Sequence, residues 1–219
     1  MEERIGLLFD VDGVLVDSLH HTYRAITFVC DKVGVTPPTF EMMQCTMGAP
    51  YHEFWHSIGV RAPQEEVSLW YHQAANHRES ELFPDAREAL EHLGNHCSMP
   101  LGIVTANYEG VVEEIFARGG IAPDLIQYRA CDQQEKVAAL REFRRIYELS
   151  PIEAFFVGDL HSDMRDGRIA GVRCIGMTRG GSHASVLRAA GAEHCVTDFA
   201  ELLDYLKTGR YSPQYPRPL

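Results

Sequence analysis

Short apolar runs alternate with longer amphipathic segments along most of the chain. The runs have the length of buried strands, and the segments between them repeat apolar residues every three or four positions, as helices do. This alternation is typical of a parallel sheet with helices on both faces. The predicted strands are residues 5–9, 100–105, 124–128, 153–157 and 172–176, with a weaker candidate at 194–197.

The segments between these strands predict helices. Residues 108–120 end in a glycine pair suited to a helix C-terminus. Residues 135–149 carry apolar side chains at 137, 140, 143, 146 and 149, a stripe that would lie on the sheet. Two further helical patterns cover residues 183–191 and 198–207.

One region breaks the alternation. Residues 18–83 contain helical patterns separated by loops rich in glycine and proline, and we find no strand pattern there. The fold class is therefore α/β, a Rossmann-like parallel-sheet core (residues 1–17 and 84–206) with an inserted helical cap (residues 18–83). Residues 207–219 hold three prolines and show no periodicity, which predicts a flexible tail.

The composition of the chain argues against some kinds of binding partner. The net charge of -11 argues against nucleic acid, which is bound through excess lysine and arginine. Six scattered cysteines without a CxxC pair favour reduced thiols and a cytoplasmic location. No run approaches the roughly 18 apolar residues of a membrane span, so we expect no membrane partner. The sequence leaves a monomer and a homodimer open.

Polar side chains follow three of the predicted strands, where ligands bind in open α/β sheets. Clustered carboxylates repel one another and need a cation, and hard oxygen ligands suit Mg²⁺. A single aspartate there could instead cap a helix. Several at matching strand ends favour a metal site. The side chains concerned are Asp10, Asp12, Thr105, Asp159 and Asp163.

These motifs resemble those of the haloacid dehalogenase-like hydrolases. The resemblance is carried by DVDGVLVDS (10–18), the strand end at Thr105, a lysine before a helix, and GDLHSD (158–163). The helical insertion is similar to the cap of the subfamily that includes phosphoglycolate phosphatase and β-phosphoglucomutase.

The resemblance implies a role for each residue. Asp10 would be the nucleophile that forms an aspartyl-phosphate, and Asp12 the general acid and base. Thr105, the backbone of Ala106 and the side chain of Asn107 would hold the phosphoryl oxygens. The Mg²⁺ ligands would be Asp10, the backbone carbonyl of Asp12, Asp159 and Asp163.

The lysine motif departs from the family pattern. Relatives usually carry Lys-Pro, whereas this chain has CDQQEKVAAL at 131–140. Lys136 is the only lysine between Lys32 and Lys207, so it is our candidate to balance Asp10 and the phosphate. Arg129 is the alternative, and a solvent-exposed Lys136 is the other interpretation.

The inserted segment supplies candidate substrate contacts. Gly48 lies in a loop that approaches the substrate in relatives, and Arg24 could meet the leaving group. The string HEFWH, from His52 to His56, matches the HExxH zinc pattern. A helix surface or a substrate-facing cap is the alternative for that pair.

We therefore expect a Mg²⁺-dependent phosphatase that hydrolyses a small phosphorylated metabolite. Asp12 favours a phosphate ester, because a halide leaves without a proton. A mutase of the β-phosphoglucomutase type is the alternative, since residues 17–26 resemble its cap helix. The histidine expected there aligns with Thr22, and His20 and His21 only stand nearby. A non-catalytic binding protein on this fold is the third hypothesis.

Overall fold

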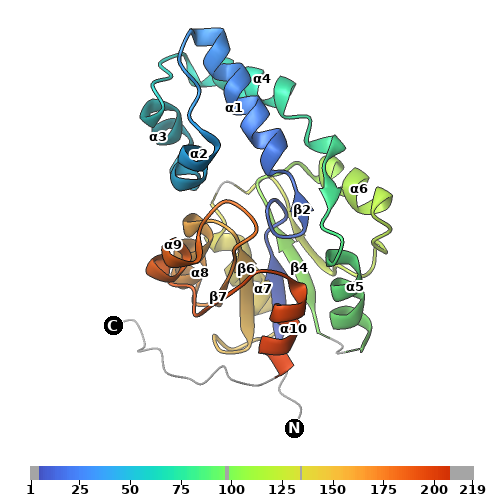
Figure 1. The fold of residues 1–219 in the computed structure, drawn as a ribbon. Coiled ribbons are helices and arrows are strands. Elements are labelled where there is room, and N and C mark those ends of the chain that lie inside the picture. The colour runs from blue at the N-terminus through green and yellow to red at the C-terminus, as the bar shows by residue number, and fades with distance from the viewer. Residues whose placement is uncertain (1–4, 97–98, 134, 208–219) are drawn as a thin grey trace.

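The computed structural model describes residues 5–96, 99–133 and 135–207. Six parallel strands form one sheet in the order β5-β4-β1-β6-β7-β8 (Figure 1). Every residue of β1 is buried, as expected for a central strand covered on both faces. The strands are β1 (Gly6–Phe9), β4 (Leu101–Val104), β5 (Tyr128–Ala130), β6 (Ala154–Gly158), β7 (Arg173–Met177) and β8 (His194–Val196).

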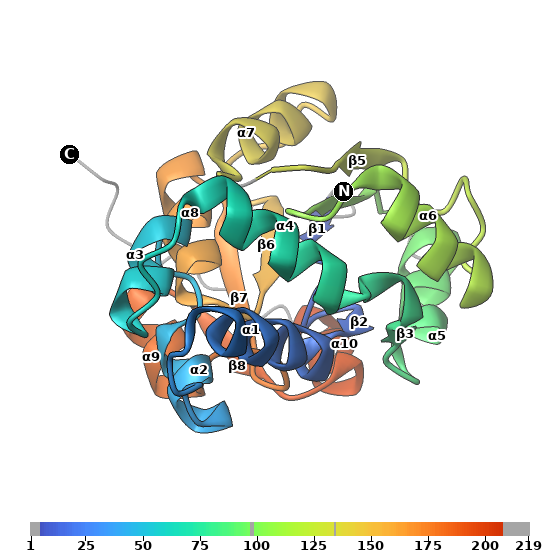
Figure 2. The same ribbon diagram turned by 90° about the horizontal axis from the view of Figure 1, so that it is seen from above.

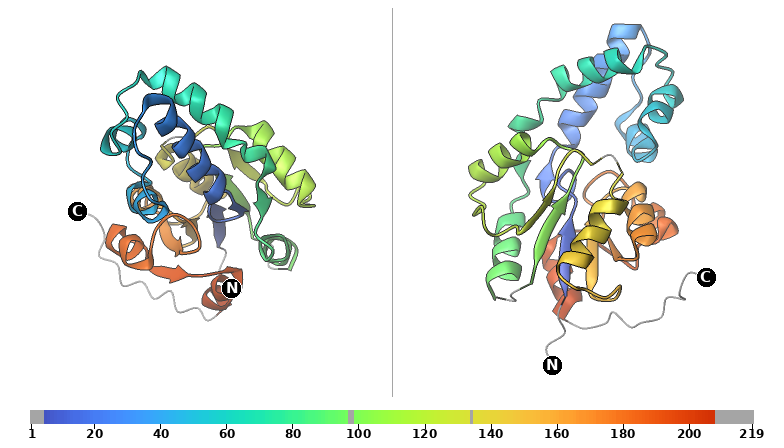
Figure 3. Two further views of the ribbon diagram at one scale, coloured as in Figure 1. Left: turned by 45° about the horizontal axis from the view of Figure 1, so that its top comes forward. Right: turned by 180° about the vertical axis from the view of Figure 1, so that it is seen from behind.

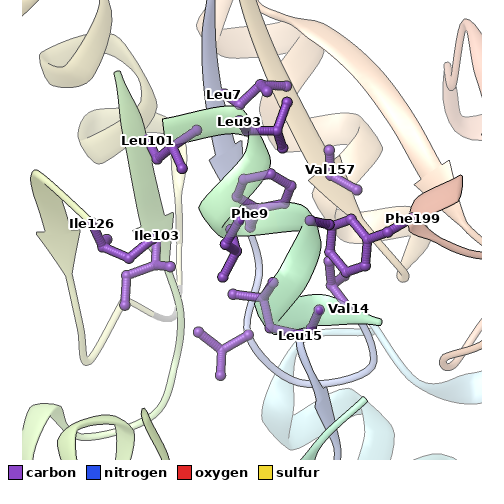
Figure 4. Close-up of a cluster of buried hydrophobic side chains, with 14 of the residues drawn as sticks. Leu7, Phe9, Val14, Leu15, Leu93, Leu101, Ile103, Ile126, Val157 and Phe199 are labelled. Atoms are coloured by element: carbon purple, nitrogen blue, oxygen red, sulfur yellow. The ribbon is translucent and has the colours of Figure 1, made fainter. Parts of the chain in front are cut away.

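Helices cover both faces of this sheet (Figure 3). Leu7 and Phe9 pack with side chains of α5, α6 and α10 on one face (Figure 4). Leu8 points the other way and joins Phe143 and Phe156 under α7 and α8. The helices of the core, on both faces together, are α5 (Ala86–Glu91), with a π-helical turn η2 (His92–His96), α6 (Glu109–Arg118), α7 (Val137–Ile146), α8 (His161–Ala170), α9 (Ala184–Ala190) and α10 (Phe199–Lys207).

The inserted segment lies over the carboxyl edge of the sheet (Figures 1 and 2). It has its own hydrophobic cluster, in which Ile26, Met43, Trp55 and Val67 are buried. This is the arrangement expected of a cap, while its exact boundaries stay a prediction. The elements are β2 (Val16–Asp17), α1 (Leu19–Val33), α2 (Phe40–Thr46), α3 (Tyr51–Ser57), α4 (Gln64–Ala75), the 3₁₀ turn η1 (His77–Glu79) and β3 (Glu81–Leu82).

Two of the strand predictions are wrong. The strand predicted at 124–128 begins only at Tyr128, because Pro123 opens a turn and the apolar residues after it bury their side chains without joining the sheet. Residues 18–83 also contain β3, which pairs antiparallel with β2. A strand of two residues is too short to show a period, so the sequence gives no signal for it.

Four smaller findings bear on the other predictions. Ile146, expected on the buried stripe of α7, is 47% exposed at the end of that helix. Helix α10 includes Lys207, and residues 208–219 of the predicted tail lie outside the described residues. The described cysteines are free thiols. No described helix is both long enough and apolar enough to cross a bilayer, and the cytoplasmic location stays a prediction.

Candidate active site

Asp10 lies directly after β1, at the carboxyl edge of the sheet. Its backbone N–H donates to the carbonyl of Val157 (2.9 Å), which ties the residue to β6. Its Oδ1 accepts from the backbone N–H of Val11 (2.7 Å), and its Oδ2 lies 2.6 Å from Nζ of Lys136. Only 5% of Asp10 is exposed, so its carboxylate is fixed in a buried site.

Asp159 and Asp163 reach the same place from the end of β6 and the first turn of α8. Asp163 accepts from Nζ of Lys136 through Oδ1 (2.8 Å) and from the backbone N–H of Leu160 through Oδ2 (3.0 Å). Asp159 accepts from the backbone N–H of Gly181 (2.5 Å). Asp10, Asp159 and Asp163 each offer an oxygen within 4.8 Å of the others. We call these three residues the acidic triad.

Burial dominates the electrostatics of the triad. Burial raises the pKa of Asp10 to about 7, and the charges of Asp163 and Asp12 add to it against the opposing ammonium of Lys136. The pKa of Asp159 is also raised, by burial first and then by Asp163 and Asp10. Burial works against the ammonium of Lys136, but Asp10 and Asp163 outweigh it and raise the pKa of Lys136.

The triad fits a divalent cation. Three buried carboxylates converge on one point, and the ammonium of Lys136 balances only part of their charge. Carboxylate oxygens in this number, with room left for water and substrate, are the donor set that Mg²⁺ takes. Asp12 was expected to add its backbone carbonyl, and that contribution stays a prediction.

Asp12 and Asn107 face each other beside the triad. Nδ2 of Asn107 donates to Oδ2 of Asp12 (2.5 Å), while Oδ1 of Asp12 is buried without a partner among the described residues. Thr105 is fully buried, and its hydroxyl accepts from the backbone N–H of Asn107 (3.1 Å). Ala106 is exposed between them. The segment 105–107 thus forms a tight turn that brings the side chain of Asn107 to Asp12.

Two glycine positions make room for Asp159. Gly13 adopts φ +70°, and a Cβ there would collide with the Asp159 carboxylate. A Cβ on Gly180 would do the same. Gly180 and Gly181 belong to the loop after β7. Gly13 follows Asp12 directly, but its steric role is visible only in the structure.

The cap meets the core at two points close to α8. A Cβ on Gly48 (φ +91°) would lie 2.9–3.1 Å from side-chain atoms of His161 and Ser162. Nε2 of Gln44 donates to the carbonyl of Gly180 (3.3 Å). The predicted contact residue Gly48 is therefore brought to the edge of the site. Arg24 is exposed on α1, and no contact among the described residues joins it to the triad.

Tyr71 of the cap lies within electrostatic reach of Asp12. Tyr71 of α4 is half-buried; burial raises its pKa, and the negative charge of Asp12 adds to the shift. Its hydroxyl lies 3.4 Å from Nε2 of His77. The sequence gives no signal for this proximity, because it depends on how the cap packs over the core.

The zinc interpretation gains no support. His52 and His56 are exposed, and Nδ1 of His56 lies 2.8 Å from the carbonyl of His52 on the same helix. The acidic triad is the only cluster of three metal-binding side chains among the described residues. Arg129, the alternative to Lys136, donates instead to the carbonyl of Pro123 (3.0 Å).

The sheet order and the acidic site at its carboxyl edge define the class: a Rossmann-like α/β enzyme with an inserted helical segment. The chain belongs to the haloacid dehalogenase-like hydrolases, because the sequence model of that family matches residues 7–177. It is a phosphatase of this family.

Curated relatives and solved structures agree with this assignment. The phosphoglycolate phosphatase of Yersinia pseudotuberculosis is 25% identical over 212 residues, covering 90% of this chain and 91% of the relative. That of Chromobacterium violaceum is 26% identical over 221 residues, covering 93% and 97%. A haloacid dehalogenase-like hydrolase from Streptococcus pneumoniae superposes with a TM-score of 0.77 at 23% identity, covering 94% of this chain and all of that one, which shows the shared fold.

Proposed function

We propose that this phosphatase hydrolyses a small phosphate monoester in a Mg²⁺-dependent reaction through an aspartyl-phosphate on Asp10. The observation that carries the proposal is the placement of Lys136. Its Nζ lies 2.6 Å from Asp10 and 2.8 Å from Asp163, inside a site that is otherwise acidic. A fixed ammonium beside a buried nucleophile is suited to binding the oxygens of a phosphoryl group.

The residues divide the reaction into two half-reactions. A carboxylate oxygen of Asp10 attacks phosphorus while the bond to the leaving oxygen breaks, and Asp12 protonates that oxygen. Asp12 then takes a proton from the water that attacks the phosphorus of the aspartyl-phosphate, which releases inorganic phosphate and restores Asp10. The hydrogen bond from Asn107 holds the Asp12 carboxylate beside Asp10 for both steps.

Several groups would stabilise the phosphoryl oxygens. The hydroxyl of Thr105, the turn at Ala106 and Asn107, and the ammonium of Lys136 border the position that these oxygens would take. Bound Mg²⁺, held by Asp10, Asp159 and Asp163, would offset the charge of the carboxylates and the phosphoryl group.

Phosphoglycolate is the first substrate to test. It is the ester named for the relatives that cover about nine-tenths of this chain. The cap side chains near Asp12 would select the substrate. At an identity near 25% these side chains have to be tested by experiment. The proposed substrate class is therefore a small, anionic phosphate monoester, with phosphoglycolate as its leading member.

The deciding experiment measures phosphate release from a panel of small esters, phosphoglycolate included. Each ester is assayed with Mg²⁺ and with EDTA, for the wild type and for Asp10→Asn. We expect Mg²⁺-dependent release that the variant lowers by at least about 1,000-fold, as loss of a nucleophile does. Acid quenching of a ³²P-ester reaction should trap label on the wild type and none on Asp10→Asn.

Two results would contradict the proposal. Phosphate release at wild-type rate from a folded Asp10→Asn would exclude a covalent step at Asp10. Label on Asp10 that passes to a second sugar phosphate, with no release to water, would make the chain a mutase. A mutase of this type would need a cap histidine at the substrate. The ring of His20 instead stacks on the ring of Phe40 in the cap, with 5.4 Å between the ring centroids, so its placement does not support the mutase.

A further inference from the structure

Helix α8 accepts hydrogen bonds from both the side chain and the backbone of Lys136. Its Nζ donates to Asp163 (2.8 Å), and its backbone N–H donates to Oδ2 of Asp166 (3.1 Å). Asp163 and Asp166 stand three positions apart on α8, so they lie on the same face of the helix. Asp166 is only 5% exposed. The phosphatase reaction described above makes no use of this second carboxylate.

We propose that Asp166 is a positioning residue, which sets the place of the Lys136 ammonium beside Asp10 through the Lys136 backbone. The inference rests on the proposed function for its catalytic consequence, but the position of Lys136 can be measured without any substrate.

The local structure gives the reason that such a hold is needed. Lys136 is the N-cap residue of α7, and its own side chain makes no capping bond. The chain before it is tied to the sheet by the N–H of Gln133, which donates to the carbonyl of Thr105 (2.9 Å). The carboxylate of Asp166 fixes the peptide N–H of Lys136, at the point where the chain enters α7.

Fixing the backbone matters because the lysine side chain is flexible. Four rotatable bonds separate Cα from the ammonium, so the range of positions open to Nζ depends on where the backbone is held. With both acceptors on α8, the spacing between them is set by the helical rise of about 1.5 Å per residue. Arg165 pairs with Oδ1 of Asp166 (3.3 Å) from the exposed side, which leaves Oδ2 for Lys136.

The first test measures the exposure of Lys136 by amine acetylation and peptide mass spectrometry. The chain has only three lysines, and the exposed Lys32 and Lys207 serve as internal references. Asp166→Ala should raise the labelling of Lys136 about fivefold relative to these references, the factor expected for loss of a capping hydrogen bond. Asp166→Asn should leave it at the wild-type level, because an amide oxygen still accepts from the backbone N–H.

Two matched variants separate positioning from general destabilisation. Asp198→Ala removes a carboxylate that accepts from the backbone N–H of Glu201 (2.9 Å) in the first turn of α10, far along the chain from the site. Arg165→Ala removes the exposed partner of Asp166. Both should leave the labelling of Lys136 unchanged. If Asp166→Ala does not fold, Asp166→Ser replaces it, since a serine hydroxyl falls short of the Lys136 N–H.

The second test is kinetic, with the ester identified by the panel. Asp166→Ala should lower kcat by about 10- to 100-fold, as small displacements of a catalytic group do, with Asp166→Asn close to wild type. Unchanged labelling of Lys136 in Asp166→Ala, together with a loss of stability like that of Asp198→Ala, would overturn the proposal. If no ester is hydrolysed, the proposed function fails, and the labelling alone decides the role of Asp166.

Discussion

The two sides of the active site are built differently. On the core side, the side chains are buried and held by short bonds, such as those from Lys136 to Asp10 and Asp163. On the cap side, Arg78 and Ser80 contact Glu114 and Arg118 of α6 closely, while two other contacts with the core are longer. Gln44 reaches the carbonyl of Gly180 at 3.3 Å, and the ring of His72 lies 5.6 Å from that of Tyr108.

This difference separates chemistry from substrate selection. The core holds the groups that would act on phosphorus, and a displacement of about 1 Å there is costly. The cap packs around its own hydrophobic cluster and joins the core through the short β2–β3 pair. We therefore expect changes in the core to alter kcat for every ester, and changes in the cap to alter KM from ester to ester.

The largest effect should come from Asp12→Asn. Asparagine keeps the size of the side chain and its contact with Asn107 but cannot transfer a proton. Loss of a general acid and base lowers kcat by about 10²- to 10⁴-fold for an alkyl phosphate. With p-nitrophenyl phosphate, whose leaving group needs no proton, the first half-reaction should survive and give a burst of one nitrophenolate per protein before slow turnover.

Arg24→Ala is the matched comparison from the cap. Its exposed side chain contacts none of the triad, so it should change KM without removing the proton transfer. A burst from Arg24→Ala and none from Asp12→Asn would contradict the assignment of Asp12. Stopped-flow absorbance measures both variants in one experiment.

The next effect is the dependence of stability on pH, where core and cap should act in opposite directions. In the metal-free protein, burial raises the pKa of Asp10 from 3.8 to about 7. Between these values the native state binds more protons than the unfolded state, so this contribution destabilises the protein as pH rises from about 4 to about 7. Three pKa units correspond to at most about 4 kcal/mol.

The cap histidines contribute with the opposite sign. Burial lowers the pKa of His21 and His72, so the unfolded state binds more protons just below pH 6.5 and stability falls as pH falls there. Thermal unfolding of the metal-free protein should show a higher Tm near pH 5.5 than near pH 7.5. Asp10→Asn should reduce that difference. A wild-type Tm that rises steadily over this range would contradict the core contribution.

The strand pattern could be predicted where a strand is buried on both faces. Residues of β1, β4 and β6 form unbroken apolar runs, and they lie within one residue of the predicted bounds. The edge strand β5 could not be placed, because the apolar residues before Tyr128 fill the core from a turn. A buried turn and a buried strand both consist of apolar residues, so the sequence pattern does not distinguish them.

The sequence could predict that polar residues following several strands lie together at one edge of the sheet. Asp10, Asp159 and Asp163 lie together with Lys136, although their individual roles stay predictions. Asp166 could not be found, because its meaning depends on which helix lies beside α8. The sequence places no lysine near it, and only the packing of α7 on α8 brings Lys136 within reach.

A pair of glycines with the same backbone conformation compares core with cap directly. Gly13 and Gly34 both adopt φ +70°, but a Cβ on Gly13 would strike Asp159, whereas a Cβ on Gly34 would meet nothing within 4 Å. The backbone strain alone should cost each alanine variant about 1 kcal/mol of stability, and the collision with Asp159 adds to this cost in Gly13→Ala. Only Gly13→Ala should also weaken Mg²⁺ binding, by at least about tenfold, because it displaces a proposed ligand.

Mg²⁺ titration of both variants by calorimetry, with urea unfolding alongside, measures the two effects separately. Equal Mg²⁺ affinity in both variants would contradict the place of Asp159 at the metal. A loss of affinity in Gly34→Ala would show instead that the cap takes part in binding the ion.

The smallest effect tests the contact between cap and core. Gly48 and Gly59 lie in the inserted segment with φ +91° and +92°, so alanine carries the same backbone strain at both. A Cβ on Gly48 would press on His161 and Ser162, whereas a Cβ on Gly59 would make an ordinary contact with Val35 at 3.4 Å. Gly48→Ala should therefore hold the cap slightly open and raise KM about three- to tenfold with little change in kcat, since closure adds binding contacts.

Gly59→Ala should lose the same stability and keep the wild-type KM. An unchanged KM in Gly48→Ala would mean that this contact is not needed for substrate binding, and a matching fall in kcat would mean that cap closure also aligns the groups of the core.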